Sequence, residues 1–203
     1  MSEQRTQEWF AKRLGKFTGS RFADVLAVSK RDGKKLKAYG DLIWSIAVER
    51  ISGQVDETMD SYSLRWGRDL EDFARQEYEL STGNVVEQVD FIEHPSIPYV
   101  GCSPDGLVGS DGGVEIKCPK DSAIHLQRFD NGLPDEFKPQ VQGCLWVTGR
   151  AWWDFISYDP RMPDHLRLLT MRVPRDEAYI TELNLAVNAA ELEVLKITER
   201  FKA

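Results

Sequence analysis

The hydrophobic and polar residues of the chain follow two repeating patterns, one typical of helices and one typical of strands. Apolar residues recur three and four positions apart in several stretches, a spacing that places them on one face of a helix. The predicted helices cover residues 6–14, a segment starting near Thr18–Ser20, 38–52, 64–80, 138–148, and 174–201 with an interruption near 184–188. Residues at the ends of these segments support the predicted helices. Thr6 is a typical N-cap, Pro139 is tolerated in the first turn of a helix, and Gly149 favours a helix end.

Shorter stretches alternate apolar and polar side chains or are apolar throughout, as buried strands are. They predict strands at 85–89, 99–102, 106–108, 114–118, 151–158 and 168–173. Helices and strands alternate along the chain, which is the pattern of an α/β fold, and 203 residues most simply form one domain. We therefore predict a single α/β domain with a central mixed β-sheet flanked by helices, with residues 174–203 as a C-terminal helical segment.

The composition narrows the class of protein further. No apolar run reaches the roughly 18 residues of a membrane span, and the polar N-terminus lacks the apolar core of a signal peptide. The chain is therefore predicted to be a cytoplasmic protein without a membrane partner. Its three cysteines form no C-x-x-C pair, which favours buried, reduced thiols over disulfides or a zinc site.

Charge is distributed unevenly along the chain. The net charge is −7, yet residues 1–40 contain ten Lys and Arg against four Asp and Glu, so this segment carries +6 and the remainder −13. Such asymmetry can mark a surface for a polyanion, which makes residues 1–40 a candidate DNA-end-binding segment; the alternative is a solvated basic helix and loop. The loop at 29–37 supplies the candidate nonspecific phosphate contacts, Lys30, Arg31, Lys34 and Lys35.

A predicted hairpin carries the strongest candidate chemistry. The turn "GSDGG" at 109–113 brings Asp105 alongside Glu115, and Lys117 shares the face of Glu115 because strand side chains alternate. Two facing carboxylates repel each other, and a divalent cation relieves the repulsion; Mg²⁺ typically takes one or two carboxylates plus waters and phosphate oxygens. Lys117 would then stand beside the bound water. The alternative is an exposed hairpin with a surface ion pair.

Five ordered blocks connect this hairpin to a known family. They are "RLGKFTGS" at 13–20, "GRDLE" at 67–71, "CSPDGL" at 102–107, "EIKCP" at 115–119 and "QVQGCLWVT" at 140–148, and "YDPRM" follows at 158–162. Together with the motif P-D…(D/E)-x-K, they resemble the lambda exonuclease, or YqaJ-type, phage recombination exonucleases. The resemblance implies a restriction-endonuclease-like PD-(D/E)xK core.

The resemblance also implies roles for individual residues. Glu71 would join Asp105 and Glu115 in the acidic site, and the carbonyl of Ile116 would be a further ligand. Such a site would hold two Mg²⁺, for which Mn²⁺ would substitute. The pocket for a 5′-terminal phosphate would consist of Arg13, Ser20, Ser103 and Gln140. Arg offers a bidentate fork, and a hydroxyl at a helix start lies among free N–H groups that favour an anion.

The resemblance is loose in parts of the chain. Residues 35–60, 120–137 and the C-terminal helix match least, and Asp121-Ser122-Ala123 stands where the family has a basic residue. Gln142, two residues from the predicted pocket residue Gln140, would support the site, contact DNA or do neither.

These observations predict a Mg²⁺-dependent exonuclease that degrades one strand of duplex DNA from a 5′-phosphorylated end to mononucleotides and leaves a 3′ overhang. The residues themselves support metal-assisted phosphodiester hydrolysis, whereas polarity and duplex preference come from the resemblance. Alternatives are an endonuclease or repair nuclease of the same fold, or a noncatalytic DNA-binding module. The resemblance further implies a homotrimeric ring in a bacterial host cell and a phage single-strand annealing protein as partner.

Overall fold

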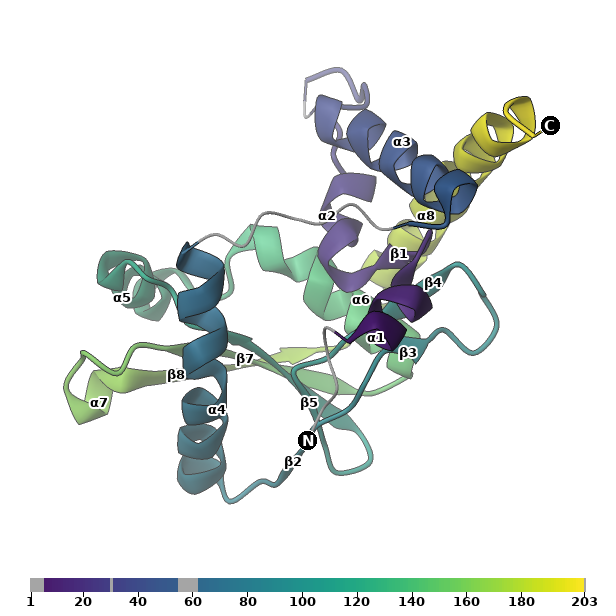
Figure 1. The fold of residues 1–203 in the computed structure, drawn as a ribbon. Helices are drawn as coiled ribbons and strands as arrows, with labels where there is room; N and C mark the ends of the chain where they lie inside the picture. The colour runs from purple at the N-terminus through teal and green to yellow at the C-terminus, as the bar shows by residue number, and fades with distance from the viewer. Residues whose placement is uncertain (1–5, 30, 55–61, 203) are drawn as a thin grey trace.

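The computed structural model describes residues 6–29, 31–54 and 62–202 (Figure 1). The helices are α1 Gln7–Arg13, α2 Phe22–Val25, α3 Lys37–Ser52, α4 Tyr62–Thr82, α5 Ser122–Asn131, α6 Lys138–Thr148, α7 Asp164–Arg167 and α8 Glu177–Arg200, with 3-10 turns η1 Gly19–Arg21 and η2 Asp135–Phe137. The strands are β1 Phe17–Thr18, β2 Val86–Glu87, β3 Ile92–Glu93, β4 Val100–Cys102, β5 Gly106–Val108, β6 Gly112–Lys117, β7 Trp152–Tyr158 and β8 Leu168–Pro174.

The strands form two mixed sheets. The larger sheet has five strands in the order β2-β5-β6-β7-β8, and the smaller has three in the order β1-β4-β3. Within the larger sheet β6 and β7 run parallel, because α5 and α6 lie between them in the chain, and the other pairs are antiparallel. The predicted single α/β domain with a mixed sheet flanked by helices is thus confirmed.

The central strands bury side chains on both faces of the larger sheet. Ile116 and Ile156 pack on one face with Ala74 and Tyr78 of α4. Residues of opposite parity, such as Phe155, join the main core on the other face, which includes α6 and α8 (Figure 1). Because β6 is covered on both sides, a polar residue on it is removed from water unless it lies at the end of the strand.

Two glycines at the start of β6, Gly112 and Gly113, are required by the packing of the neighbouring strand and not by the turn of the hairpin. The turn itself occupies 109–111, and Gly112 and Gly113 already belong to β6. A Cβ on Gly112 would stand 2.1 Å from the ring of Trp152, and one on Gly113 would stand 2.4 Å from the ring of Trp153. The two tryptophans of the neighbouring strand therefore pack where side chains of β6 would otherwise project.

Several elements differ from the sequence-based expectation. The segment predicted to begin a helix near Thr18–Ser20 first forms β1, whose two residues pair in parallel with β4, and its helical part begins with η1 at Gly19. The short elements β3 and α7 and the helix α5 were not predicted. In α5 the buried residues are His125 and Arg128, so its inward face is polar and shows no apolar periodicity.

The predicted interruption of the last helix is also wrong, since α8 is continuous through 184–188. Asparagine disfavours helix interiors because its side chain competes for backbone groups. In α8 the side chain of Asn188 forms its hydrogen bonds without breaking the helix. Its Nδ2 donates to the carbonyl oxygen and to Oδ1 of Asn184, both at 2.8 Å, and its Oδ1 accepts from Tyr99 Oη at 2.5 Å.

The predicted states of the cysteines and of the chain's apolar segments can also be compared with the structure. Cys102, Cys118 and Cys144 are free and buried, as expected. Among the described helices, none combines the length and hydropathy that a membrane span requires.

The contact between Gly113 and Trp153 generates a stability prediction. Gly113→Ala should lower the free energy of unfolding by about 1–3 kcal/mol, because the added methyl group overpacks a fully buried ring. Gly40→Ala is the matched control: Gly40 lies in α3 with nothing within 4 Å of its Cβ position, so this change should stabilise the protein by up to about 1 kcal/mol. Urea unfolding monitored by tryptophan fluorescence measures both, and equal effects would contradict the packing argument.

Candidate active site

A cavity of about 380 Å³ opens at the carboxyl end of β6. Residues that the sequence singled out from five separate segments line it, namely Arg13, Ser20, Glu71, Ser103, Asp105, Glu115, Ile116, Lys117 and Gln140. Helix α4 brings Glu71 from one side of the sheet, and α6 brings Gln140 from the other. The fold therefore gathers both predicted residue groups, the acidic site and the phosphate pocket, around one cavity.

Glu115 is the most deeply buried acid of this cavity, with 1% of its surface exposed. Its Oε1 accepts a hydrogen bond from Lys117 Nζ at 2.5 Å and another from Gln140 Nε2 at 2.6 Å, whereas the buried Oε2 has no hydrogen-bond partner. Burial raises the pKa of Glu115 to about 7; Lys117 opposes this shift, and Asp105 and Glu71 add to it.

Asp105 lies directly opposite, before the first residue of β5. Its Oδ2 accepts a hydrogen bond from the backbone N–H of Ile116 at 2.6 Å. The ladder pairs Gly106 with Val114, so the next step of the same register places Asp105 across from Glu115. The predicted juxtaposition of the two acids on the hairpin is therefore present in the structure.

Lys117 has its ammonium group between the acids and an aromatic ring. Its Nζ lies 5.2 Å from the centre of the Phe137 ring and is paired with Glu115. Burial alone would lower the pKa of Lys117, but the charges of Glu115 and Asp105 outweigh burial and the pKa is raised. The side chain therefore carries a positive charge suited to stabilising negative charge on a phosphate.

Glu71 reaches the cavity from the surface of α4. Its Oε1 accepts a hydrogen bond from Arg75 Nη2 at 3.0 Å, and Arg75 Nη1 also donates to Asp72. Gly67, one turn earlier on α4, also lines the cavity and has open space at its Cβ position. Arg75 thus holds Glu71 in place, and the missing side chain of Gly67 leaves room beside it.

The acids have the chemistry that a hard divalent cation requires. Within residues 6–29, 31–54 and 62–202, no group of three or more Asp, Glu, His or Cys is close enough to hold a metal ion. Mg²⁺, however, usually binds through one or two carboxylates and keeps several waters. The unpartnered Oε2 of Glu115 is a buried acceptor in a residue that lines the cavity with Asp105, so this pair fits such an ion.

Arg13 occupies the other side of the cavity. Its Nη1 donates to Ser103 Oγ at 2.9 Å, its Nη2 donates to Thr18 Oγ1 at 3.3 Å, and its guanidinium lies 4.2 Å from the centre of the Trp9 ring. Burial lowers the pKa of Arg13 to about 10. No carboxylate pairs with it within the described part of the chain, so a partly buried positive charge faces the cavity.

Ser20 lies in η1, beside Arg13 in the cavity lining. The helix expected to start there consists only of η1 and α2, from Gly19 to Val25. A helix this short contributes little dipole, so the charge available to a phosphate comes mainly from the Arg13 guanidinium.

The turn after Arg13 is held on both sides. The N–H of Gly15 donates to Glu49 Oε2 at 2.8 Å, and the carbonyl of Gly15 accepts from Arg50 Nε at 2.8 Å. Arg50 makes a bidentate pair with Glu191 of α8, at 2.8 and 2.7 Å. Gly15 has φ +66°, and a Cβ there would stand 2.5 Å from Arg50 Cγ. Two helices thus fix the backbone that carries Arg13.

Gln140 and Gln142 have different environments. Gln140 donates to Glu115, so it contacts the acidic site directly and lines the cavity beside Ser20. Gln142 is 1% exposed; it donates to the carbonyl of Pro174 and accepts from the N–H of Asp176. The prediction that Gln142 contacts DNA is therefore wrong, because burial under the start of α8 removes it from the surface. It joins α6 to the segment before α8 instead.

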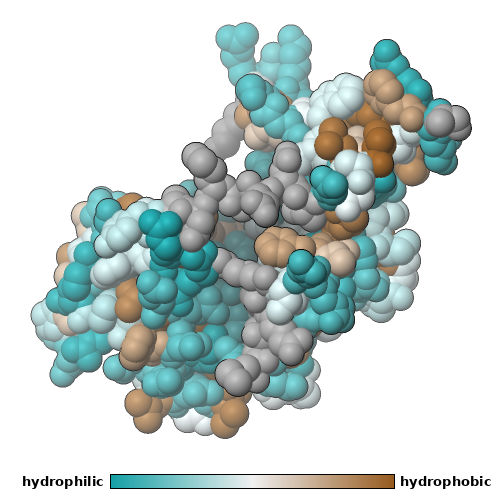
Figure 2. Space-filling view, viewed as in Figure 1, coloured by the Kyte–Doolittle hydropathy of each residue, from teal (hydrophilic) through white to brown (hydrophobic). Residues whose placement is uncertain are grey.

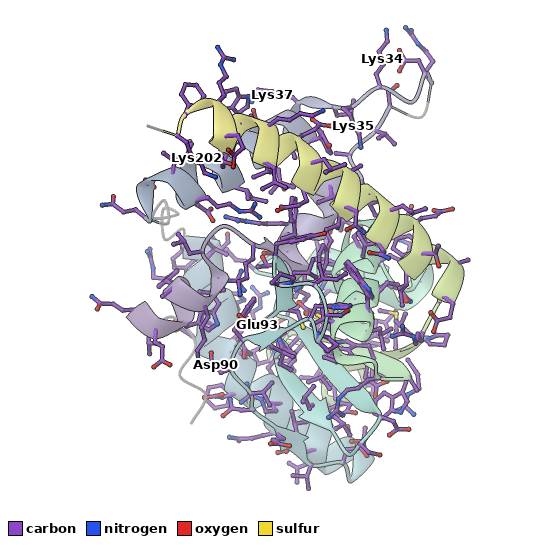
Figure 3. All side chains as sticks on the ribbon, turned by 90° about the vertical axis from the view of Figure 1, so that its right-hand side faces the viewer. Lys34, Lys35, Lys37, Asp90, Glu93 and Lys202 are labelled. Atoms are coloured by element: carbon purple, nitrogen blue, oxygen red, sulfur yellow. The ribbon has the colours of Figure 1, made fainter. Side chains whose placement is uncertain are left out.

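The basic loop projects from the body next to α3, as Figure 3 shows for Lys34 and Lys35. Arg31, Lys34 and Lys35 are exposed, and Lys35 Nζ lies 4.0 Å from the centre of the Tyr39 ring. Lys30 lies outside the described residues. These residues remain predicted DNA contacts.

Much of the basic charge in residues 1–40 is compensated within the fold. Carboxylates pair with Lys12, Lys16, Arg21, Lys34 and Lys37. The formal charge of +6 therefore overstates the free positive charge of this segment. Arg13 differs from these residues in having no such partner within the described chain.

The cavity lining also contains residues that were not predicted, among them Trp9, Arg68 and Arg128. Trp9 could have been found from its helical spacing, since it precedes Arg13 by one turn of α1. Arg68 lies inside the block "GRDLE". Arg128 comes from α5, in the segment where the resemblance is loose; there Asp121 caps the helix by accepting a hydrogen bond from the N–H of Ala123.

Comparisons with known proteins agree with this arrangement. Residues 8–151 match the model of the YqaJ-like viral recombinase domain. The alkaline exonuclease LHK-Exo from Laribacter hongkongensis has a similar structure, with 38% identity, 96% of this chain and 95% of that chain covered, and a TM-score of 0.88. Its complex with dAMP gives the same identity and TM-score over 97% and 96% of the two chains.

A phage-related exonuclease from Haemophilus somnus 129PT shares the fold, with a TM-score of 0.72 at 16% identity over 92% of this chain and 96% of that chain. No curated protein matches the chain. The family match covers most of the chain, and the similarity to LHK-Exo extends over nearly all of it. The chain therefore belongs to the YqaJ-like viral recombinase family and is a nuclease related to the alkaline exonucleases.

Proposed function

We propose that the protein is a Mg²⁺-dependent exonuclease that degrades the 5′-phosphorylated strand of duplex DNA to mononucleotides and leaves a 3′ overhang. One observation carries the proposal: the Asp105–Glu115–Lys117 set and the partly buried cation Arg13 line the same cavity of about 380 Å³. A site for hydrolysis and a site for an anion are thus adjacent. This is the arrangement needed to cut a strand close to its phosphorylated end.

The metal would be held by Asp105 and Glu115, with Glu71 and the carbonyl of Ile116 as further proposed ligands. When bound, Mg²⁺ activates water and neutralises charge on the phosphate, and Mn²⁺ is expected to substitute. The chain's own residues prepare this site. Gln140 and Lys117 orient Glu115 through its Oε1, and the Ile116 N–H orients Asp105.

Binding of the strand end would depend on Arg13, Ser20 and Ser103. Arg13 is fixed by Ser103 and Thr18 and by packing on Trp9, so its guanidinium is oriented before DNA arrives. A 5′-phosphate there would leave the next phosphodiester of the strand near Lys117, whose charge stabilises the phosphate oxygens during cleavage. With the strand end held at Arg13 and the next phosphodiester cut near Lys117, each cut would release one nucleotide.

The solved relatives support the nature of the product. LHK-Exo has been crystallised with dAMP, a deoxynucleoside monophosphate. At 38% identity over nearly the whole chain, a similar ligand is expected in this cavity. The closely related alternative is an endonuclease or repair nuclease of the same fold, which would not depend on a 5′-phosphate. The noncatalytic alternative is disfavoured, because Asp105, Glu115 and Lys117 are all present and adjacent.

We further propose that the protein works as a homotrimer with a phage single-strand annealing protein that coats the overhang. Apart from residues 1–40 the chain carries −13, so most of a lone subunit repels DNA. A ring would place several Arg13-type sites around one duplex. Exposed apolar side chains on neighbouring parts of α3 and α8 provide a surface for such contacts (Figure 2), namely Trp44, Val48, Ile51, Leu195 and Phe201.

The first functional prediction concerns the acidic site. Activity should require Mg²⁺ or Mn²⁺ and disappear in EDTA. Asp105→Ala should remove metal binding and turnover together, whereas Lys117→Met should lower turnover about 100-fold or more and retain metal, because an ammonium group cannot ligate a cation. Calorimetry of Mn²⁺ binding and digestion of end-labelled duplex measure the two effects.

Asp111→Asn is the control, because Asp111 is an exposed acid of the same hairpin. Near-normal turnover in Lys117→Met would refute the assignment.

The second concerns the strand end. Duplexes with a 5′-phosphate should be digested much faster than duplexes with a 5′-hydroxyl. Arg13→Ala should reduce that ratio about tenfold or more, because it removes a charge-assisted contact to the phosphate. Lys12→Ala is a matched control, since Lys12 has the same charge on the same helix but pairs with Asp90. Equal rates on both ends with the unmodified protein would rule out the exonuclease assignment and favour an endonuclease.

The third concerns assembly. Light scattering should give a mass of about 70 kDa, three times the chain mass of 23.2 kDa. Trp44→Asp should produce monomers, because it places a charge within the apolar α3–α8 surface. Leu80→Asp should leave the mass unchanged, since Leu80 is exposed on α4 instead. A monomer mass for the unmodified protein over a wide concentration range would contradict the ring.

A further inference from the structure

Arg128 of α5 is a buried cation beside the cavity. It is 6% exposed, and its guanidinium lies 5.4 and 5.5 Å from the centres of the Phe137 and Phe155 rings. Its Nη1 donates to Ser157 Oγ at 2.9 Å, and its buried Nε has no hydrogen-bond partner. Burying a guanidinium with donors unused costs free energy, so the arrangement is unfavourable for stability alone.

Two other arginines, the buried Arg75 and the partly buried Arg50, have carboxylate partners. Arg75 pairs with Glu71 and Asp72, and Arg50 makes a bidentate pair with Glu191. Arg128 makes no ion pair within the described part of the chain. Glu136 acts on this charge from a distance, but no carboxylate contacts the guanidinium, and an anionic ligand in the cavity would supply a direct partner.

The sheet register places Arg128 close to Lys117. Ser157 of β7 and Lys117 of β6 are directly paired in the parallel ladder, so their side chains project from the same face of the sheet. Arg128 binds Ser157, and both Arg128 and Lys117 lie within 5.4 Å of the centre of the Phe137 ring. Arg128 and Lys117 also line the same cavity. Arg128 and Lys117 therefore lie on the same face of the sheet and both contact the Phe137 ring.

Arg13 and Arg128 enter the cavity from different elements. Arg13 comes from α1, through its contact with Ser103, and Arg128 comes from α5, over β7. Lys117 lies near Arg128, and its own charge is already paired with Glu115. The cavity thus has two separate guanidinium groups that lack carboxylates within the described chain, which matches two successive phosphates of one DNA strand.

We propose that Arg128 binds the phosphate of the first phosphodiester bond, the one to be cut, while the 5′-terminal phosphate lies at Arg13. This inference rests on the proposed function and assigns a further substrate-contacting residue. The Nε and Nη2 edge of the guanidinium would donate to a nonbridging oxygen of that phosphate, where negative charge grows during hydrolysis. Ser157 and the two phenylalanines hold the guanidinium in position for this contact.

The test pairs a change in the protein with a change in the DNA. A 5′-phosphorylated duplex is made in two forms that differ only at the first linkage, which is either a phosphodiester or a neutral methylphosphonate. Binding of both forms is measured by fluorescence anisotropy in EDTA, where hydrolysis does not occur, for the unmodified protein, Arg128→Met and Gln127→Met. Gln127 is the matched control, because it is exposed on the same helix and does not line the cavity.

The unmodified protein and Gln127→Met should bind the neutral form about tenfold more weakly or worse, because a charge-assisted hydrogen bond is lost. Arg128→Met should bind both forms alike. An equal penalty in Arg128→Met and in the unmodified protein would overturn the proposal. If Arg128→Met does not fold, Arg128→Gln, which retains a donor to Ser157, is used with the same criterion.

The same experiment separates the inference from the function on which it rests. Suppose that binding requires a 5′-phosphate but the phosphodiester and methylphosphonate duplexes differ in affinity by the same factor in the unmodified protein and in Arg128→Met. That result would refute only the role of Arg128. Binding that ignores the 5′-phosphate altogether would refute the proposed exonuclease function.

Discussion

The desolvation of Glu115 constrains much of the surrounding structure. A carboxylate on a strand covered on both faces is costly unless its oxygens are satisfied. Gln140 from α6 and Lys117 from the same strand satisfy one oxygen, while the other remains without a partner. The crossover from β6 through α5 and α6 to β7 brings Gln140 to this position. The same carboxylate thus limits stability and supplies the chemistry of the site.

The sequence predicts the parts of the fold whose information is local. Pro139 and Gly149 bound α6 as expected, and the alternation around Glu115 and Lys117 predicts which residues share a face of β6. Arg128 could not be predicted in this way, because the inward face of α5 is polar and its partner Ser157 is distant in the chain. Gln142 shows the opposite difficulty, since its burial depends on the segment before α8. Long-range contacts of polar residues leave no periodic trace in the sequence.

Arginines in this fold divide by whether the protein itself compensates them. Arg50 and Arg75 are partnered by carboxylates: Arg50 joins α3 to α8 through Glu191, and Arg75 pairs with Glu71 within α4. Arg13 and Arg128 are held by hydroxyl groups and aromatic rings instead, which orient a guanidinium without neutralising it. Neutral supports therefore keep the charge available to a ligand. Formal charge counts miss this distinction, because they treat every arginine as equivalent.

The hydrogen bonds that hold the Gly15 turn have a consequence for the synthesis and folding of the protein. Arg50 and Glu191 are separated by 141 positions, and Arg50 also holds the carbonyl of Gly15. At typical rates of protein synthesis, Glu191 leaves the ribosome's active centre on the order of ten seconds after Arg50. The acidic hairpin of β5 and β6 is complete well before that moment. A nascent chain therefore contains Asp105, Glu115 and Lys117 while the backbone that carries Arg13 is still incompletely anchored, so the cavity is fully assembled only as α8 docks.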